Sequence, residues 1–123
     1  MNVLVDTSVW VAHFKQRNEA LVALLHAGWV VCHPHVVVEV ACGTPPQRQQ
    51  IIEMLSELEA LPVATPGELL ALLEWQVIFG RGCGFVDLSL LASALLGQPT
   101  SLWTLDKRLN TIAHELGLAY RHT

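Results

Sequence analysis

The sequence has few cysteines, few basic residues and no long uninterrupted apolar run. Its cysteines, Cys32, Cys42 and Cys83, are odd in number and have no paired spacing, which argues against the disulfide framework of a small secreted protein. No apolar stretch is long enough to span a membrane, and no basic segment precedes an apolar run at the N-terminus. These absences predict a soluble protein of the reducing cytoplasm with no membrane partner.

Basic residues are also scarce. Lys and Arg number 7 against 11 Asp and Glu, which gives a formal net charge of -4. This is the wrong sign for a protein that holds nucleic acid through a broad basic face. A nucleic-acid function therefore requires that several acids gather in a pocket neutralised by metal, leaving the basic residues to face the polyanion.

What the chain does contain is enough apolar material for one folded domain. The apolar fraction is 52% and the charged fraction 15% over 123 residues, and a chain of this length buries about two-thirds of its unfolded surface. We interpret residues 1–123 as a single domain. The apolar surplus favours a sheet covered on both faces, and an oligomer interface as well.

Short apolar runs alternate with helical patterns along the chain, which predicts an α/β fold with a central parallel sheet flanked by helices. The expected strands are residues 3–5, 29–32, 61–64, 101–104 and 118–120. The expected helices are residues 9–14, 18–27, 47–61, 67–79, 86–96 and 107–116. Local propensity leaves residues 35–42 open between strand and helix, because valines are frequent there.

Two acids follow buried strands directly. Asp6 comes after residues 3–5, and Asp106 comes just after residues 101–104. In open α/β sheets, ligands bind at the carboxyl ends of the strands. For this segment alone, however, capping of the helix that begins near Val9 by Asp6, Thr7 or Ser8 is the simpler interpretation, because all three are good N-cap residues.

Two further acids lie in apolar surroundings. Asp87 opens an apolar helix after the glycine-rich residues 80–84, and Glu39 interrupts the apolar residues 36–41. Acids in such settings are rarely buried without a partner, yet the nearest basic residues lie in polar or loop segments. Carboxylates without basic partners indicate a cation, and hard oxygen ligands of this kind suit Mg²⁺ or Mn²⁺.

Four short motifs occur in order along the chain. They are residues 3–10 (VLVDTSVW), residues 38–40 followed by Gly43, residues 87–94 (DLSLLASA) and residues 103–106 (WTLD). Together they resemble the successive motifs of a PIN domain, most closely the small single-domain PIN proteins that act as VapC-type toxins of toxin–antitoxin pairs. The resemblance covers nearly the whole chain. It implies a three-layer sandwich with a central parallel sheet, a helical Glu39 and a metal-dependent endoribonuclease.

The resemblance also implies site residues. The acidic quartet would be Asp6, Glu39, Asp87 and Asp106, which would be both metal ligands and catalytic residues for Mg²⁺, with Mn²⁺ as a substitute. The hydroxyls of Ser8 and Thr104 would hold a carboxylate or a metal-bound water in place. Leu105 and Leu109 depart from the family pattern, where a basic and an aromatic residue are common, and this concerns substrate contacts more than metal binding.

The implied partners are an RNA substrate, a cognate antitoxin and a second copy of the chain in a homodimer. Arg81, Lys107 and Arg108 are candidate phosphate contacts because each is near a quartet acid in sequence. Solvated surface charge explains any one of them equally well. For the antitoxin, the resemblance implies a tail that crosses the acidic groove, where an arginine would pair with Asp6 or Asp87.

Other interpretations are weaker. His33 and His35 with Cys32 and Cys42 match no standard zinc-ligand spacing. A phosphoacceptor receiver domain would need paired acids after the first strand and a lysine after the last, and this sequence has neither. A PIN-like binding module that holds no metal stays open.

Overall fold

The computed structural model describes residues 1–121, in which four parallel strands form one sheet in the order β3–β2–β1–β4. The strands are β1 (Asn2–Val5), β2 (Val30–Cys32), β3 (Glu59–Ala60) and β4 (Thr100–Trp103). β1 pairs with both β2 and β4, and its residues Val3, Leu4 and Val5 are fully buried. The apolar run at the N-terminus is therefore an inner strand, as its lack of polar alternation predicts.

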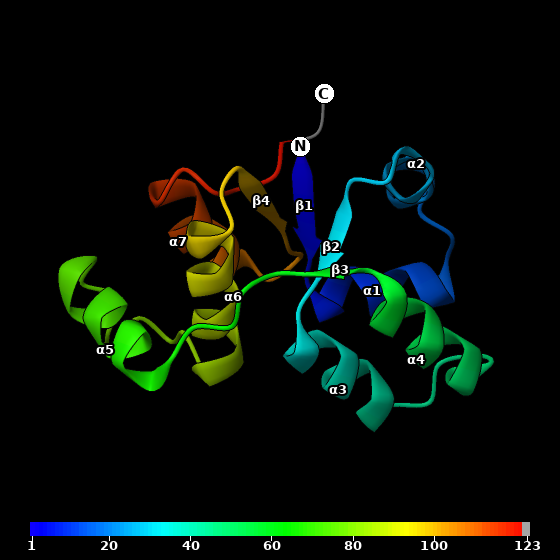
Figure 1. Ribbon diagram of the computed structural model, residues 1–123, viewed down its shortest axis with the longest axis horizontal. Helices are drawn as coiled ribbons and strands as arrows, with labels where there is room; N and C mark the ends of the chain where they lie inside the picture. Colours follow the sequence, from blue (N-terminus) through cyan, green and yellow to red (C-terminus); the bar gives the residue numbers. More distant parts are fainter. Residues whose placement is uncertain (122–123) are drawn as a thin grey trace.

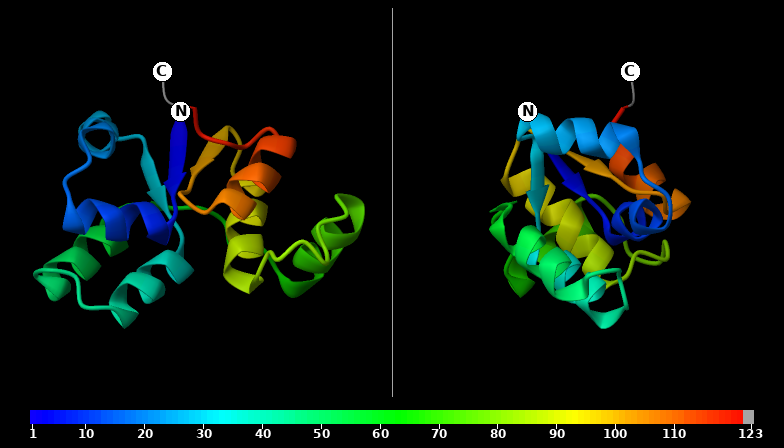
Figure 2. Two further views of the ribbon diagram at one scale, coloured as in Figure 1. Left: turned by 180° about the vertical axis from the view of Figure 1, so that it is seen from behind. Right: turned by 90° about the vertical axis from the view of Figure 1, so that its right-hand side faces the viewer.

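Seven helices flank the sheet in this part of the chain. They are α1 (Thr7–Lys15), α2 (Glu19–Ala27), α3 (Pro34–Cys42), α4 (Arg48–Glu57), α5 (Pro66–Trp75), α6 (Phe85–Leu96) and α7 (Lys107–Glu115). α6 lies in front of the sheet in Figure 1, whereas α1 and α7 come to the front when the molecule is seen from behind in Figure 2. This confirms the predicted α/β fold of three layers.

The valine-rich segment that propensity left open is helix α3. Pro34 occupies its first turn, and the His33 ring accepts a hydrogen bond from the His35 backbone N–H at 3.0 Å, so the helix has both a rigid start and a cap. Val36 and Val40, one turn apart, face the core. Tertiary packing thus overrides the strand preference of valine.

Three predicted boundaries were wrong. The edge strand lies at Glu59–Ala60 and not at residues 61–64, because its pairing is set by β2 and Pro62 has no N–H with which to continue the ladder. α4 accordingly ends at Glu57, before the edge strand, and not at residue 61. α5 ends at Trp75 instead of residue 79, because Val77 adopts a φ of 52°.

Of two apolar segments near the sheet, residues 118–120 depart from the predicted strand, whereas α6 is buried as its apolar sequence predicts. Residues 118–120 contribute one isolated bridge, between Ala119 and Leu102, and not a full strand. α6 is buried from Leu88 to Ala94 because it packs between the sheet and α5. Within residues 1–121, none of the helices combines the length and the apolar character needed to cross a bilayer.

Candidate active site

The acidic residues gather at the carboxyl ends of β1 and β4. The parallel register pairs Val5 with Trp103, and the Asp6 backbone N–H donates to the Trp103 carbonyl at 2.9 Å. The residues that follow the two strands, Asp6 and Thr104, must therefore meet. This edge of the sheet has α3 on one side and α6 on the other (Figure 1).

The side chain of Asp6 does not cap α1. Although Asp6 occupies the N-cap position, its Oδ2 accepts hydrogen bonds from Ser8 Oγ at 2.8 Å and from Thr104 Oγ1 at 2.7 Å. Only 7% of Asp6 is exposed. The capping interpretation of this residue was wrong: two hydroxyls hold the carboxylate in a fixed orientation, and its Oδ1 accepts no hydrogen bond from any described residue.

The same hydroxyls connect the two loops. Ser8 Oγ accepts from the Leu105 backbone N–H at 3.0 Å, and Thr104 Oγ1 accepts from the Asp106 backbone N–H at 3.0 Å. Each hydroxyl therefore donates to Asp6 and accepts from the backbone that follows β4. The network fixes the loop after β1 to the loop after β4.

Asp106 is the acid that caps a helix. Its Oδ1 accepts from the backbone N–H groups of Arg108 at 2.9 Å and Leu109 at 3.1 Å, in the first turn of α7. These bonds stabilise the carboxylate and fix its direction. Its second oxygen, Oδ2, accepts none from the described residues.

Glu39 projects from α3 and is positioned by a residue that the sequence interpretation missed. Thr7 Oγ1 donates to Glu39 Oε1 at 2.7 Å, across 32 residues of sequence. The sequence did contain one signal for Thr7. It lies between Asp6 and Ser8, in a run of three polar residues that directly follows the first strand.

The pKa of Asp87 responds to the charges of the other three acids. Its pKa is raised, first by burial, then by the negative charges of Asp6 and Asp106, with a smaller contribution from Glu39. A backbone hydrogen bond at Gly84 opposes the rise. No basic side chain of residues 1–121 is among the groups that shift this pKa, so Asp87 has no basic counter-charge from the protein.

Cys83 lies beside the quartet and is not a nucleophile. Burial and the charges of Asp87 and Asp106 raise the pKa of its thiol to about 11. A thiol with such a pKa stays protonated at neutral pH, and the thiolate is the reactive form. In the metal-free protein its sulfur accordingly adds no negative charge to the site.

The donor set fits a hard divalent cation. All four groups offer carboxylate oxygens, and each of Asp6, Glu39 and Asp106 already has one oxygen fixed by a hydrogen bond. In residues 1–121 no three His, Cys, Asp or Glu side chains are close enough together to hold an ion directly. Mg²⁺ keeps several water ligands and needs only one or two carboxylates, so this arrangement suits an ion held partly through water.

The candidate phosphate contacts differ in their surroundings. Arg81 forms a two-pronged ion pair with Glu115 of α7, with both N–O distances 2.7 Å. The guanidinium of Arg108 lies against Gly82, so close that a Cβ on residue 82 would be 2.8 Å from Arg108 Nη1. Lys107 is exposed in the first turn of α7. Arg81 is thus occupied in bracing the glycine-rich loop against α7, a role that its sequence neighbours did not indicate.

The zinc alternative has no support in the geometry. Nδ1 of His33 is used for capping α3, and the buried Cys32 directs its Sγ to the His33 carbonyl. Cys42 lies at the opposite end of α3. These side chains form no metal-binding cluster in the described residues.

Comparison with known proteins agrees with this arrangement. The profile of the PIN domain family matches residues 3–115. The chain belongs to the PIN domain family. It is also 42% identical over 117 residues to ribonuclease VapC32 of Mycobacterium tuberculosis, in both the CDC 1551/Oshkosh and the H37Rv strains, and the match covers 95% of this chain and 94% of that protein. A PIN domain with the four acids at one edge of its sheet is therefore the framework for assigning function.

Proposed function

We propose that this PIN domain is a metal-dependent endoribonuclease, the toxin of a VapC-type toxin–antitoxin pair acting in the cytoplasm. The observation that carries the proposal is the electrostatic coupling of Asp87 to Asp6, Asp106 and Glu39 without a basic counter-charge. A pocket of this kind repels phosphate unless a cation enters it. The similarity to a protein named ribonuclease supports RNA as the substrate.

When bound, Mg²⁺ supplies an activated water and neutralises charge on the scissile phosphate. The protein's own contribution is preorganisation. Ser8 and Thr104 fix Asp6, Thr7 fixes Glu39, and backbone N–H groups fix Asp106, so one or two of these carboxylates would bind the metal directly and the others through its water ligands. Burial and the neighbouring acids raise the pKa of Asp87, and a bound cation would lower it again.

Cleavage of single-stranded or loop RNA is expected to require Mg²⁺ or Mn²⁺, because only a cation makes the acidic pocket compatible with phosphate. EDTA should abolish it, and added Mn²⁺ should restore it. The measurement is gel analysis of labelled RNA, with products carrying 5′-phosphate and 3′-hydroxyl ends. Full cleavage in metal-free buffer would contradict the proposal.

A metal-free binding module is the second candidate, because no three acids of the described residues are close enough to ligate one ion. The two candidates differ in a simple thermal measurement. A nuclease site should gain several degrees in Tm from saturating Mn²⁺, because the ion binds the folded state alone. A binding module should gain nothing and should show no ribonuclease activity.

The basic residues should contribute unequally to RNA binding. Arg108→Gln and Lys107→Gln are each expected to weaken binding at low salt severalfold and to reduce its salt dependence, as removal of a phosphate contact does. Arg81→Gln should have a smaller effect on the salt dependence, because Glu115 already neutralises Arg81. Fluorescence anisotropy from 50 to 200 mM salt tests this, and equal slopes for all variants would contradict it.

We also propose a homodimer that binds a cognate antitoxin. A groove of about 380 Å³ between α5 and α6 is lined by Leu72, Trp75 and Leu95, and Trp75 is 81% exposed. Exposed aromatic surface of this kind is typical of protein interfaces. Size-exclusion chromatography with light scattering should give twice the chain mass, and a strict monomer at micromolar concentration would contradict the dimer.

A further inference from the structure

We propose that Phe85, backed by His35 and His33, is a stacking site for one nucleobase of single-stranded RNA beside the acidic quartet. The inference rests on the proposed ribonuclease function and adds a residue that determines how the substrate is positioned. It concerns a row of three rings that runs from the end of β2 to the start of α6.

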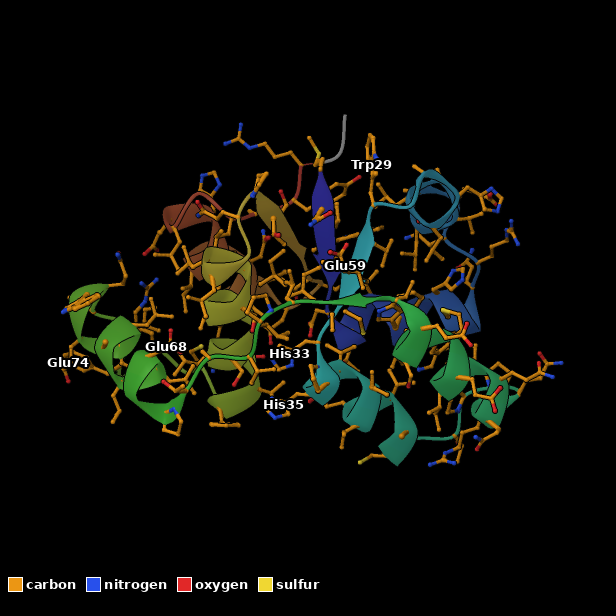
Figure 3. The ribbon with its side chains drawn as sticks, viewed as in Figure 1. Trp29, His33, His35, Glu59, Glu68 and Glu74 are labelled. Carbon is orange, nitrogen blue, oxygen red and sulfur yellow. The ribbon has the colours of Figure 1, made fainter. Side chains whose placement is uncertain are left out.

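The rings form a continuous series from the interior to the surface. The centroids of His33 and His35 are 4.8 Å apart, and those of His35 and Phe85 are 5.5 Å apart. His33 is fully buried, whereas Phe85 is 63% exposed. Figure 3 shows His33 and His35 together at the start of α3, on the side of that helix nearest α6. The innermost ring thus supports the second, and the outermost presents its surface to solvent.

This row lies next to the carboxylates. His35 and Glu39 are four residues apart on α3, so they share one face and are separated by about 6 Å along the helix axis. Phe85 and Asp87 both belong to the first turn of α6. Because His35 of α3 meets Phe85 of α6, the ring contact joins the helix that carries Glu39 to the helix that carries Asp87.

Two ring nitrogens in the row have no partner among the described residues. His33 Nε2 and His35 Nδ1 are buried, and neither makes a hydrogen bond. Nδ1 of His33 accepts from the His35 backbone, so Nε2 carries the proton and is an unsatisfied donor. Buried polar atoms without partners are rare, and both of these nitrogens belong to the rings that lie behind Phe85.

The charge distribution also favours recognition through bases. Of the seven basic residues, Arg17 and Arg81 are held in ion pairs and Arg48 donates twice to the Ala41 carbonyl. That leaves four basic residues for phosphate contacts against 11 acidic ones. Stacking on an aromatic face binds any base and does not depend on positive charge.

The test uses single-stranded RNA that carries the fluorescent base 2-aminopurine at successive positions, with the full chain in its Asp6→Asn form so that RNA is bound without cleavage. Phe85→Leu keeps apolar volume and removes the aromatic face, whereas Phe85→Trp keeps the face. Trp29→Leu is the matched control, because it removes an exposed aromatic that precedes β2, at the opposite end of that strand from His33 (Figure 3). Phe85→Leu is expected to raise the Kd about tenfold or more and to abolish the quenching at one position. Phe85→Trp and Trp29→Leu should preserve both.

Wild-type Kd and quenching in Phe85→Leu would overturn the stacking site. A change of oligomeric state in Phe85→Leu without a change in quenching would also overturn it and would assign Phe85 to a protein interface. Cleavage is measured separately, with the protein that keeps Asp6. If this protein cuts RNA but Phe85→Leu does not change RNA binding, the stacking site is contradicted and the nuclease function is not. If quenching depends on Phe85 but the protein with Asp6 intact cuts no RNA, the nuclease function is contradicted and the stacking site is not. Absence of any RNA binding would contradict both.

Discussion

Asp87→Asn is expected to abolish RNA cleavage and, in EDTA, to raise the Tm of the protein by roughly 2–4 °C. Cleavage should fail because a proposed metal ligand is lost. The Tm rises because the folded protein holds Asp87 close to Asp6, Asp106 and Glu39, and their mutual repulsion disappears with its charge. The gain stays small because Asp87 is partly exposed and solvent screens the repulsion.

The pH dependence of this effect has a definite sign. The pKa of Asp87 is raised in the folded state, so between its unfolded value of 3.8 and the raised value the folded protein binds more protons than the unfolded chain. The metal-free protein therefore loses stability from this group as the pH rises through that window. The advantage of Asp87→Asn should be absent below pH 3.8 and should reach its full size above the raised pKa.

Melting curves in EDTA and in Mg²⁺ at several pH values measure both effects. Glu74→Gln is the control, because it removes one negative charge on α5, away from His33, His35 and the start of α3 (Figure 3). That variant should cut RNA normally and keep the Tm gain from Mg²⁺. If Asp87→Asn melted lower than wild type in EDTA and still gained as much from Mg²⁺, Asp87 would be a structural residue of α6.

The strands and the acids could be predicted because their signals are local. Residues 3–5 are apolar without alternation, which is the pattern of a strand buried on both faces. Asp6 follows that strand immediately, so parallel pairing alone places it at the ligand-binding edge of the sheet. No contact with another segment has to be known for either conclusion.

The roles of the two strand-end acids could not be predicted, because they depend on partners far away in sequence. Asp6 and Asp106 each precede a helix, and both have the chemistry of a cap. Thr104, 98 residues from Asp6, provides one of the hydroxyls that hold Asp6 away from α1. The carboxylate of Asp106 accepts no hydrogen bond from a hydroxyl of the described residues and accepts instead from N–H groups of its own helix.

The misplaced segments have the same cause. The position of β3 is set by its register with Cys32, and that of Arg81 by Glu115, 34 residues further along. The periodicity of apolar residues in the sequence detects the helices. It does not detect the strand pairing at which a helix ends, or the ion pair that holds a loop against a helix. Helix ends and loop contacts were therefore the least predictable parts of the chain.

Asp6→Ala is expected to abolish cleavage like Asp87→Asn but to lower the stability, by about 2–4 kcal/mol. The difference in sign comes from the hydrogen bonds of Asp6. Its Oδ2 accepts from both Ser8 and Thr104 in a site that is only 7% exposed, so alanine would leave two hydroxyl donors without an acceptor. Each such loss costs about 1–3 kcal/mol, and the Tm should fall by roughly 10 °C.

Asp6→Asn is the matched variant for this prediction. The amide oxygen of asparagine can take the position of Oδ2 and accept both hydrogen bonds, so this variant should also lose cleavage while its Tm in EDTA stays within a few degrees of wild type. Ser8→Ala adds a test of coupling, since it should cost less stability in the Asp6→Ala background than in wild type. Additive losses for Asp6→Ala and Ser8→Ala, or an Asp6→Ala protein that melts like Asp6→Asn, would show that the hydroxyl network does not hold the Asp6 carboxylate.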